Sequence, residues 1–213
     1  LANLTYLELS WNNLSGEIPA QIFYGLNNLN ILALHSNQLS GELPWGGASR
    51  HRGTRGLSHV YLQDNQLNGA IPPEISDFSS LWVLDLSNNN LSGQIPTEIG
   101  DMESLGLLNL HENDLSGLIP ESICNYTWNF SNPTYFTIHD NNLCPPYPQC
   151  ILGEEFEDLN GNGEAEGDEP YSDYGLDLLP DTGDFGEGNG QFDGNYMGEQ
   201  ECDSDGDGCV DLE

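Results

Sequence analysis

The fold is decided by the stretch Leu84-Asp-Leu-Ser-Asn-Asn-Asn-Leu-Ser-Gly-Gln-Ile-Pro96. One residue separates Leu84 from Leu86, so in a β-strand both side chains point to the same face. Asn89 follows where the chain must turn, and its amide can satisfy the backbone groups that a buried turn would otherwise leave unpaired. Gly93 permits a positive φ and Pro96 forbids a helix at this point. The stretch therefore predicts a short strand with a buried face, followed by a turn.

The same pattern recurs along residues 1–143, with an asparagine as its fixed point. One coil of about 24 residues cannot bury its leucine face alone, so successive coils must stack and share a core. The repeat predicts a solenoid with a parallel sheet on its concave side. The aligned asparagines, spaced by 25, 28, 24, 24 and 28 residues, are Asn12, Asn37, Asn65, Asn89, Asn113 and Asn141.

The turn that follows each asparagine carries the motif Leu-Ser-Gly-x-Ile-Pro or a close variant, in residues 15–19, 40–44, 68–72, 92–96 and 116–120. This motif resembles the plant-type leucine-rich repeat of plant receptor ectodomains, pectinase-inhibitor proteins and some secreted bacterial proteins. The resemblance implies an α/β-type solenoid whose convex side is mostly irregular or 3-10 helical. It also implies that the concave face binds proteins, peptides or glycans.

The segment Asn141-Asn-Leu-Cys-Pro-Pro-Tyr-Pro-Gln-Cys150 resembles the disulfide-closed C-terminal cap of that family. We therefore place the solenoid in residues 1–150, with a cap from about 124 to 150, and expect Cys144 and Cys150 to take part in a disulfide. Residues 1–150 lack an N-terminal cysteine cap, because Leu1 already lies within a repeat. An open solenoid end exposes apolar residues and strand edges. Further protein or another molecule is expected to cover that end.

Cysteine usage points to an oxidising compartment. The five cysteines lie in loop-like surroundings without histidine at a zinc-like spacing, so structural disulfides are the better interpretation. We expect a local bridge between Cys202 and Cys209, and a second bridge between two of the remaining three cysteines. The protein is thus expected outside the cell or at the cell surface. Among the sequons for N-glycosylation, Asn125 and Asn129 in the irregular last coil are the better candidate sites.

The charge is strongly negative and unevenly distributed. The chain of 213 residues has 35 acidic residues, 3 arginines and no lysine, for a net charge of −32. Nucleic acids and anionic membranes are therefore excluded as partners, and no apolar run approaches the roughly 18 residues of a membrane span. Residues 151–213 hold 21 of the acids. The rise in acidic content after residue 150 predicts a second, loop-rich region in residues 151–213, which we expect calcium to stabilise.

Two segments of that region have the ligand spacing of an EF-hand loop, in which oxygen atoms converge from one short stretch of chain. In the first, Gly163 makes the tight turn. Its predicted ligands are Asp158, Asn160, Asn162, Glu164, Glu166 and Glu169. The second resembles dockerin-type loops and the acidic repeats of thrombospondins. Its predicted ligands are Asp203, Asp205, Asp207, Cys209 and Asp211. A third, less regular group consists of Asp184, Glu187, Asn189 and Asp193. Without bound ions, the acidic side chains of this region would repel one another, so we expect it to fold only with Ca²⁺.

The concave face offers the candidate ligand-binding residues. Aromatic, histidine and acidic side chains alternate outward along the predicted strands, which suits a polar ligand or a basic peptide. The sequence shows no pattern that pairs a catalytic nucleophile with a base, so we expect no enzymatic activity. The residues singled out are Tyr6, Trp11, His35, His59, Tyr61, Asp85, His111 and His139.

Two functions fit these features. The first is extracellular recognition or adhesion, with a protein or glycan bound on the concave face. The alternative is a structural subunit that assembles head to tail into a calcium-dependent filament. In that case the uncapped first repeat and the basic loop 50–55 would meet the acidic region of the next copy, a contact that does not close on itself.

Overall fold

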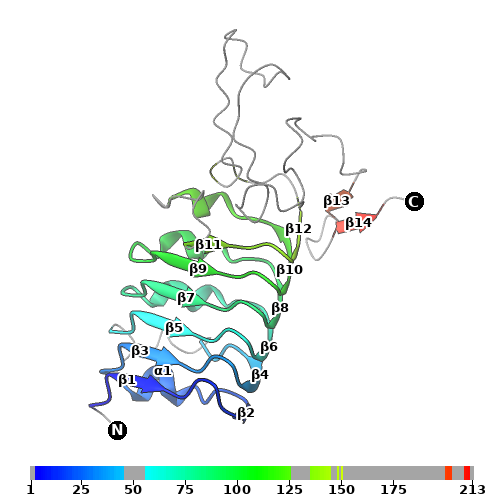
Figure 1. The fold of residues 1–213 in the computed structure, drawn as a ribbon. Helices are drawn as coiled ribbons and strands as arrows, with labels where there is room; N and C mark the ends of the chain where they lie inside the picture. The colour runs from blue at the N-terminus through cyan, green and yellow to red at the C-terminus, as the bar shows by residue number, and fades with distance from the viewer. Residues whose placement is uncertain are drawn as a thin grey trace.

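The structure is a computed structural model that describes residues 3–45, 56–125, 135–144, 148 and 150, together with the backbone of residues 200–202 and 209–211. The described residues from 3 to 45, 56 to 125 and 135 to 144 wind into a stack of coils, each with three sides, and the coils follow one another in sequence order (Figure 1). The predicted leucine-rich-repeat solenoid is confirmed.

The first side of each coil contributes one strand to a six-stranded sheet in the order β1-β3-β5-β7-β9-β11. All neighbouring strands run parallel, and Leu32, Val60, Leu84 and Leu108 are buried at matching positions. These strands coincide with the leucine-x-leucine segments, as the alternation predicts. They are β1 (Tyr6–Glu8), β3 (Ile31–Ala33), β5 (His59–Tyr61), β7 (Val83–Asp85), β9 (Leu107–Asn109) and β11 (Phe136–Thr137).

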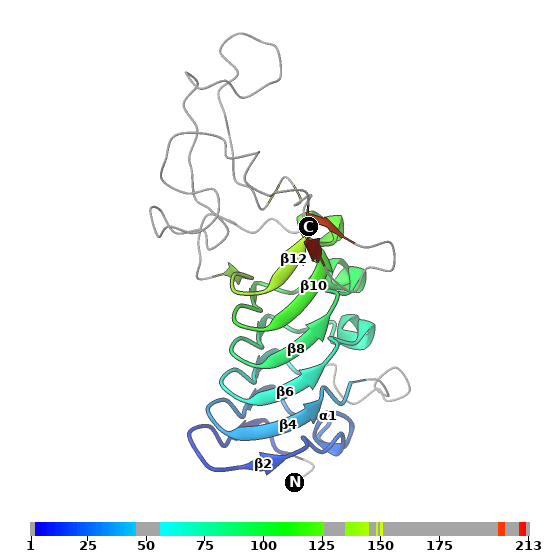
Figure 2. The same cartoon turned by 90° about the vertical axis from the view of Figure 1, so that its right-hand side faces the viewer.

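The second side forms another six-stranded parallel sheet, β2-β4-β6-β8-β10-β12, which the sequence analysis did not predict (Figure 2). It arises where the chain leaves the asparagine turn, and its glycines have φ values from 75° to 86°. The strands are β2 (Ser15–Gly16), β4 (Gln38–Glu42), β6 (Gln66–Gly69), β8 (Asn90–Gly93), β10 (Asp114–Leu118) and β12 (Asn142–Cys144).

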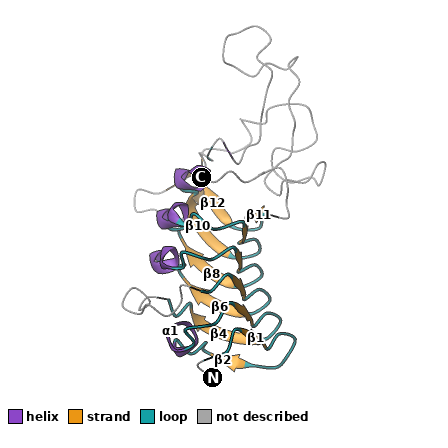
Figure 3. Cartoon of the chain, turned by 90° about the vertical axis from the view of Figure 1, so that its left-hand side faces the viewer, coloured by secondary structure: helices purple, strands orange, loops and turns teal. Residues whose placement is uncertain are grey.

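The third side carries short helices, which lie across the solenoid from the first sheet (Figure 3). The first is α1 (Gln21–Gly25), and three later coils have 3-10 helices as expected: η3 (Pro73–Asp77), η4 (Thr97–Asp101) and η5 (Glu121–Asn125). Extended Pro72 and Pro96 precede η3 and η4. The isoleucine in the middle of each 3-10 helix is fully buried, so these helices close the core on this side.

Trp45 fills the core next to a coil that has no helix in its described residues. Its indole is buried and lies edge-on to Phe23 and Phe78, with ring centroids 6.0 and 5.6 Å away. Phe23 and Phe78 come from the coils on either side. One large aromatic side chain therefore bridges the gap that a helix would otherwise fill. The basic loop 50–55 follows Trp45 but lies outside the described residues.

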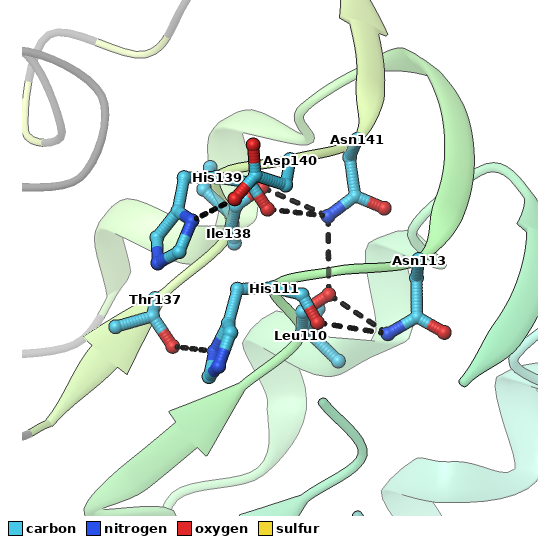
Figure 4. Close-up of polar contacts among 8 residues, drawn as sticks. All are labelled: Leu110, His111, Asn113, Thr137, Ile138, His139, Asp140 and Asn141. Atoms are coloured by element: carbon cyan, nitrogen blue, oxygen red, sulfur yellow. Dashed lines mark hydrogen bonds and ion pairs between the residues drawn. The ribbon is translucent and has the colours of Figure 1, made fainter. Parts of the chain in front are cut away.

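The repeated asparagines tie each coil to the one before it. The Nδ2 group of Asn89 donates to the backbone carbonyls of Leu62, Leu86 and Ser87, while its Oδ1 accepts from the N–H of Leu67 at 3.0 Å. The same four bonds recur at the other repeat asparagines, of which Figure 4 shows two at the C-terminal end. These are Asn37, Asn65, Asn113 and Asn141. The predicted role of these asparagines is confirmed.

Cys150 forms a disulfide, but its partner is Cys124 rather than Cys144. Cys124 lies on η5, packed against the core, and its Cα is 5.6 Å from that of Cys150, a separation that suits a disulfide. Cys144, fully buried at the end of β12, is also disulfide-bonded, and its partner lies outside the described residues. Cys144 and Cys150 thus both take part in disulfides, as expected, but they do not pair with each other. The Cys124–Cys150 bond is the second bridge expected between two of the three remaining cysteines, and it closes the C-terminal coil. The bond runs from the helical side rather than from the second sheet.

Strands β13 (Gln200–Cys202) and β14 (Cys209–Asp211) pair antiparallel, with Cys202 opposite Cys209. Their side chains, and hence the predicted Cys202–Cys209 bridge, lie outside the described residues. The predicted calcium ligands of residues 158–193 and 203–207 also lie outside them. Among the described residues, no helix is long and apolar enough to cross a membrane.

Candidate ligand-binding face

The outward face of the first sheet, which we call the concave face, presents three ladders of side chains. Strand register aligns Tyr6, His59 and Val83 in one ladder, and Glu8, Tyr61 and Asp85 in the next. The third ladder follows the strand ends and holds Ser10, His35, Gln63, Ser87, His111 and His139. All eight residues predicted to bind a ligand belong to this face or to the turn beside it.

The N-terminal half of the concave face is aromatic. Trp11 lies edge-on to His35 with ring centroids 6.0 Å apart, and His35 in turn lies edge-on to Tyr61 at 6.4 Å. His59 is tilted against the same Tyr61 at 6.2 Å. Four of the predicted residues of the first three coils, Trp11, His35, Tyr61 and His59, therefore form one continuous aromatic surface rather than isolated side chains.

Trp11 is unusual among the residues that precede the repeat asparagines. All six adopt a left-handed conformation, with φ between 51° and 57°, and the later coils place small or polar residues there. Aspartate and asparagine tolerate this conformation, whereas a bulky residue is strained in it. Trp11 also leaves 79% of its surface exposed. It is therefore both strained and poorly buried, which is typical of a residue kept for binding.

At the first coil, Tyr6 and Ser10 both hydrogen-bond to Glu8. The Tyr6 hydroxyl donates to Oε2 at 2.8 Å, and the backbone N–H and hydroxyl of Ser10 donate to Oε1. The bond from the Ser10 hydroxyl, followed by that from Tyr6, lowers the pKa of Glu8. The same contact with Glu8 raises the pKa of Tyr6. A fixed carboxylate thus stands beside the aromatic surface.

The C-terminal half of the concave face is polar and is linked by hydrogen bonds across three coils. Asp85 accepts from the Ser87 hydroxyl at 2.6 Å and from Asn109 Nδ2 at 3.0 Å. The Thr137 hydroxyl donates to Asn109 Oδ1 at 3.0 Å and lies 2.7 Å from His111 Nδ1. A single chain of bonds therefore runs from the carboxylate on β7 to the histidine beyond β9.

His111 and His139 stack on each other, with ring centroids 4.8 Å apart and 20° between the ring planes (Figure 4). The Nδ1 of His139 lies 2.8 Å from Oδ2 of Asp140. Burial, and secondly the neighbouring His139, lower the pKa of His111 below its usual 6.5. His111 is therefore held in its neutral form.

Acidic side chains line the turn beside this ladder. Asp64 joins three coils, because it accepts from the Ser36 hydroxyl at 3.1 Å and from Asn88 Nδ2 at 2.8 Å. Glu112 and Asp140 occupy the equivalent positions further along. The described residues include no lysine or arginine, so no fixed positive side chain in this part of the protein neutralises these acids. The face is suited to a cationic ligand.

Trp82 is a candidate binding residue that the sequence analysis missed. It directly precedes β7, leaves 53% of its surface exposed, and lies against Gly106, where a Cβ atom would stand 2.6 Å from the indole. It was overlooked because it comes before the outward alternation begins. The available signal was a glycine at the equivalent position of the next coil, which leaves room for a neighbouring ring.

The remaining predicted sites are only partly covered by the structure. Asn125 is exposed at the end of η5, whereas Asn129 lies outside the described residues. Among the residues described, no group of three or more histidine, cysteine, aspartate and glutamate side chains could hold a metal ion. Calcium binding in the acidic region, which lies outside the described residues, stays a prediction.

Comparisons with known proteins agree with this architecture. The family model described as Leucine Rich Repeat matches residues 3–24, 56–78, 80–102 and 104–126. No curated protein sequence matches the chain. Among solved structures, the BIR2 ectodomain from Arabidopsis thaliana is 36% identical with a TM-score of 0.55, and the alignment covers 67% of this chain and 71% of that one.

A chain of the BIR3–SERK2 complex from Arabidopsis thaliana is 34% identical, with a TM-score of 0.56 and coverage of 68% and 72%. The plant peptide hormone receptor RGFR1 in complex with RGF2 is 27% identical, with a TM-score of 0.60 and coverage of 70% of this chain. The chain spans only 23% of RGFR1's length but more than two thirds of the two shorter ectodomain structures.

Proposed function

The chain belongs to the leucine-rich-repeat family, and from that premise we propose that its concave face binds an extended, basic segment of another protein outside the cell. The protein acts there as a non-catalytic recognition or adhesion module. One similar structure, BIR2, is described as an ectodomain, and another, RGFR1, is a plant peptide hormone receptor in complex with RGF2. These relatives support a protein ligand and an extracellular location.

The observation that carries the proposal is the strained and exposed Trp11 at the edge of a continuous aromatic surface. The positive φ of Trp11 strains the backbone, and the exposed indole gains no burial free energy that would offset this strain in the free protein. Contact with a ligand would bury the indole together with Tyr61 and Tyr6. Large aromatic side chains supply much of the binding energy at protein interfaces.

The acidic residues beside this surface define the ligand's charge. Glu8 and Asp85 share a ladder with Tyr61, and Asp64 lies in the adjoining turn at the position equivalent to Trp11. Each of these carboxylates is fixed by hydrogen bonds. A basic segment would complement them and would associate faster at low salt. An extended conformation suits the face, because ligand side chains can then contact successive coils at a spacing of about 5 Å.

Selection from a peptide library displayed on phage, with the whole chain as bait, tests this proposal. Amide hydrogen exchange with a selected peptide then locates the bound surface. We expect enrichment of peptides with lysine or arginine next to aromatic residues, and protection on β1, β3, β5 and β7. A panel of oligosaccharides is screened in parallel, because exposed indoles also suit glycans. Protection confined to the helical side, or no enrichment from either panel, would contradict the proposal.

Calcium is the second part of the proposal. All but one of the predicted ligands between Asp158 and Asp211 carry side-chain oxygen donors, which is the donor type that calcium prefers. Cys209, the exception, would contribute its backbone carbonyl. The antiparallel pairing of β13 with β14 brings together the ends of the segment that contains Asp205 and Asp207. Circular dichroism with and without a chelator tests the idea, and we expect lost structure and a lower melting temperature without calcium. Identical spectra and melting temperatures would argue against it.

Self-assembly into a calcium-dependent filament is the alternative function, and the charge distribution favours it. All three arginines lie in residues 50–55, whereas residues 151–213 hold 21 of the 35 acids. These two regions of neighbouring copies would attract each other head to tail. Light scattering decides the question: calcium-dependent growth in mass supports assembly, and a constant monomer mass rejects it.

A further inference from the structure

The hydrogen-bond chain on the polar half of the concave face fixes which nitrogen of His111 carries a hydrogen. A carboxylate only accepts, so Asn109 must direct its Nδ2 to Asp85, and its Oδ1 must then accept from Thr137. The single Thr137 hydrogen is used in that bond. Its oxygen therefore accepts from His111, which places a hydrogen on Nδ1.

The same reasoning applies to His139, because its Nδ1 faces the Asp140 carboxylate at 2.8 Å and must donate to it. In both neutral rings the remaining lone pair is thus on Nε2. Neither Nε2 has a hydrogen-bond partner among the described residues, and neither is among their buried unpaired atoms. Two acceptors with fixed tautomers therefore reach the surface side by side.

We propose that His111 and His139 form a subsite that binds an ammonium group of the ligand, such as a lysine side chain, through their two Nε2 lone pairs. The proposal deepens the peptide-binding function and rests on it. An ammonium group has three separate N–H donors, so one group can bond to both rings, whose centroids are 4.8 Å apart. Asp140 and Glu112 beside the pair add electrostatic attraction.

A metal ion fits this pair less well, because the described residues supply no third ligand to join the two histidines. An acidic ligand is disfavoured as well, because Asp85, Glu112 and Asp140 would repel it. The observations therefore favour an ammonium group.

The subsite requires neutral histidines, so acidification should switch it off. The charged groups that face His111 are Asp85 on the preceding coil, Glu112 on its own coil, and Asp140 and His139 on the next coil. Burial and His139 outweigh the three acids and lower the pKa of His111. His111 thus stays neutral further into acid than an ordinary histidine, and ammonium binding to it fails once the pH falls through the lowered pKa of His111.

NMR of the histidine rings in the full chain, with pentalysine as the probe, tests the subsite without knowledge of the natural ligand. The ring signals are assigned with His111→Gln and His139→Gln variants, and each signal reports on its own ring even if pentalysine also binds the acidic C-terminal region. At pH 7.5 we expect both ring signals to shift along one saturation curve. At a pH low enough for the His111 ring signals to show protonation, the affinity read from these signals should be about tenfold weaker, the equivalent of one charge-assisted hydrogen bond.

Thr137→Val tests whether Thr137 positions His111. Valine keeps the shape of the side chain but removes the hydroxyl, so the ¹⁵N shifts of His111 should lose the signature of the Nδ1–H tautomer. Thr97→Val, on η4 across the solenoid, is the matched control and should leave those shifts unchanged.

Three outcomes would overturn the subsite: ring signals that do not respond to pentalysine, signals that respond to pentaglutamate instead, or binding that strengthens when His111 is protonated. None of them rejects the peptide-binding function, because selected peptides could still bind the aromatic half.

Discussion

The side-chain Oδ1 of Asn89 accepts a hydrogen bond of 3.0 Å from the backbone N–H of Leu67, one coil earlier in the solenoid. The amide of Asn89 also satisfies three backbone carbonyls, and the residue is buried. One side chain thereby pairs four backbone groups that water cannot reach. Stacking of the coils depends on this arrangement as well as on the shared leucine core.

Replacement of Asn89 with alanine should therefore be costly. We expect Asn89→Ala to lower the free energy of unfolding by on the order of 3 kcal/mol, because buried backbone groups lose their partners. The matched control is Asn12→Ala in the first coil, where the amide is exposed and makes two bonds, and where we expect a loss below about 1 kcal/mol. Urea unfolding measures both. Equal losses in the two variants would show that the buried hydrogen bonds of Asn89 contribute little to stability.

The neutral state of His111 should make stability depend on pH. Its pKa in the folded protein is lowered by burial and by His139, so the unfolded chain binds a proton first as the pH falls. The stabilisation that neutral His111 gives the folded protein is fully present above the ordinary histidine pKa of about 6.5. It is lost as the pH falls from there through the lowered pKa of His111 in the folded protein. Unfolding midpoints between pH 7.5 and 5.0 should therefore fall more steeply for the wild type than for His111→Gln. Parallel curves would contradict this account.

Gly106→Ala should displace Trp82 without disturbing the fold. The new Cβ would stand 2.6 Å from the indole, but Trp82 is half-exposed and its ring can swing aside. We expect a stability change below about 1 kcal/mol together with a shift in tryptophan fluorescence. Trp82→Phe/Gly106→Ala is the control and should lose that shift. An unchanged spectrum in the single variant would mean that Trp82 does not lie over Gly106.

The Cys124–Cys150 disulfide should stabilise the C-terminal coil. It closes a segment of 26 residues, for which chain entropy predicts about 3 kcal/mol. The double variant Cys124→Ala/Cys150→Ala should lower the melting temperature and increase amide exchange first in η5 and β12. Exchange that increases equally in all coils would show that the disulfide does not act locally.

The repeat asparagines and the strands around Leu84 could be predicted from the sequence because both depend on regular spacing. The second sheet could not, since its strands are as short as two residues and arise from turn geometry at Gly16 and its equivalents. The disulfide partner of Cys150 could not be predicted from the sequence either, because Cys124 approaches Cys150 only when η5 folds against the last coil. Likewise, the stack of His111 on His139 depends on register between coils, not on sequence distance.

The binding role of the concave face is tested most directly with Trp11→Asn. Asparagine tolerates the left-handed conformation at this position, so the variant should be as stable as the wild type or more stable. Its affinity for a peptide selected against the wild type should nevertheless fall about tenfold or more, the loss of one aromatic contact at an interface. Calorimetric titration and thermal unfolding of the same samples give both quantities. Weaker binding with unchanged or higher stability would support the concave face as the binding surface, and unchanged affinity would contradict it.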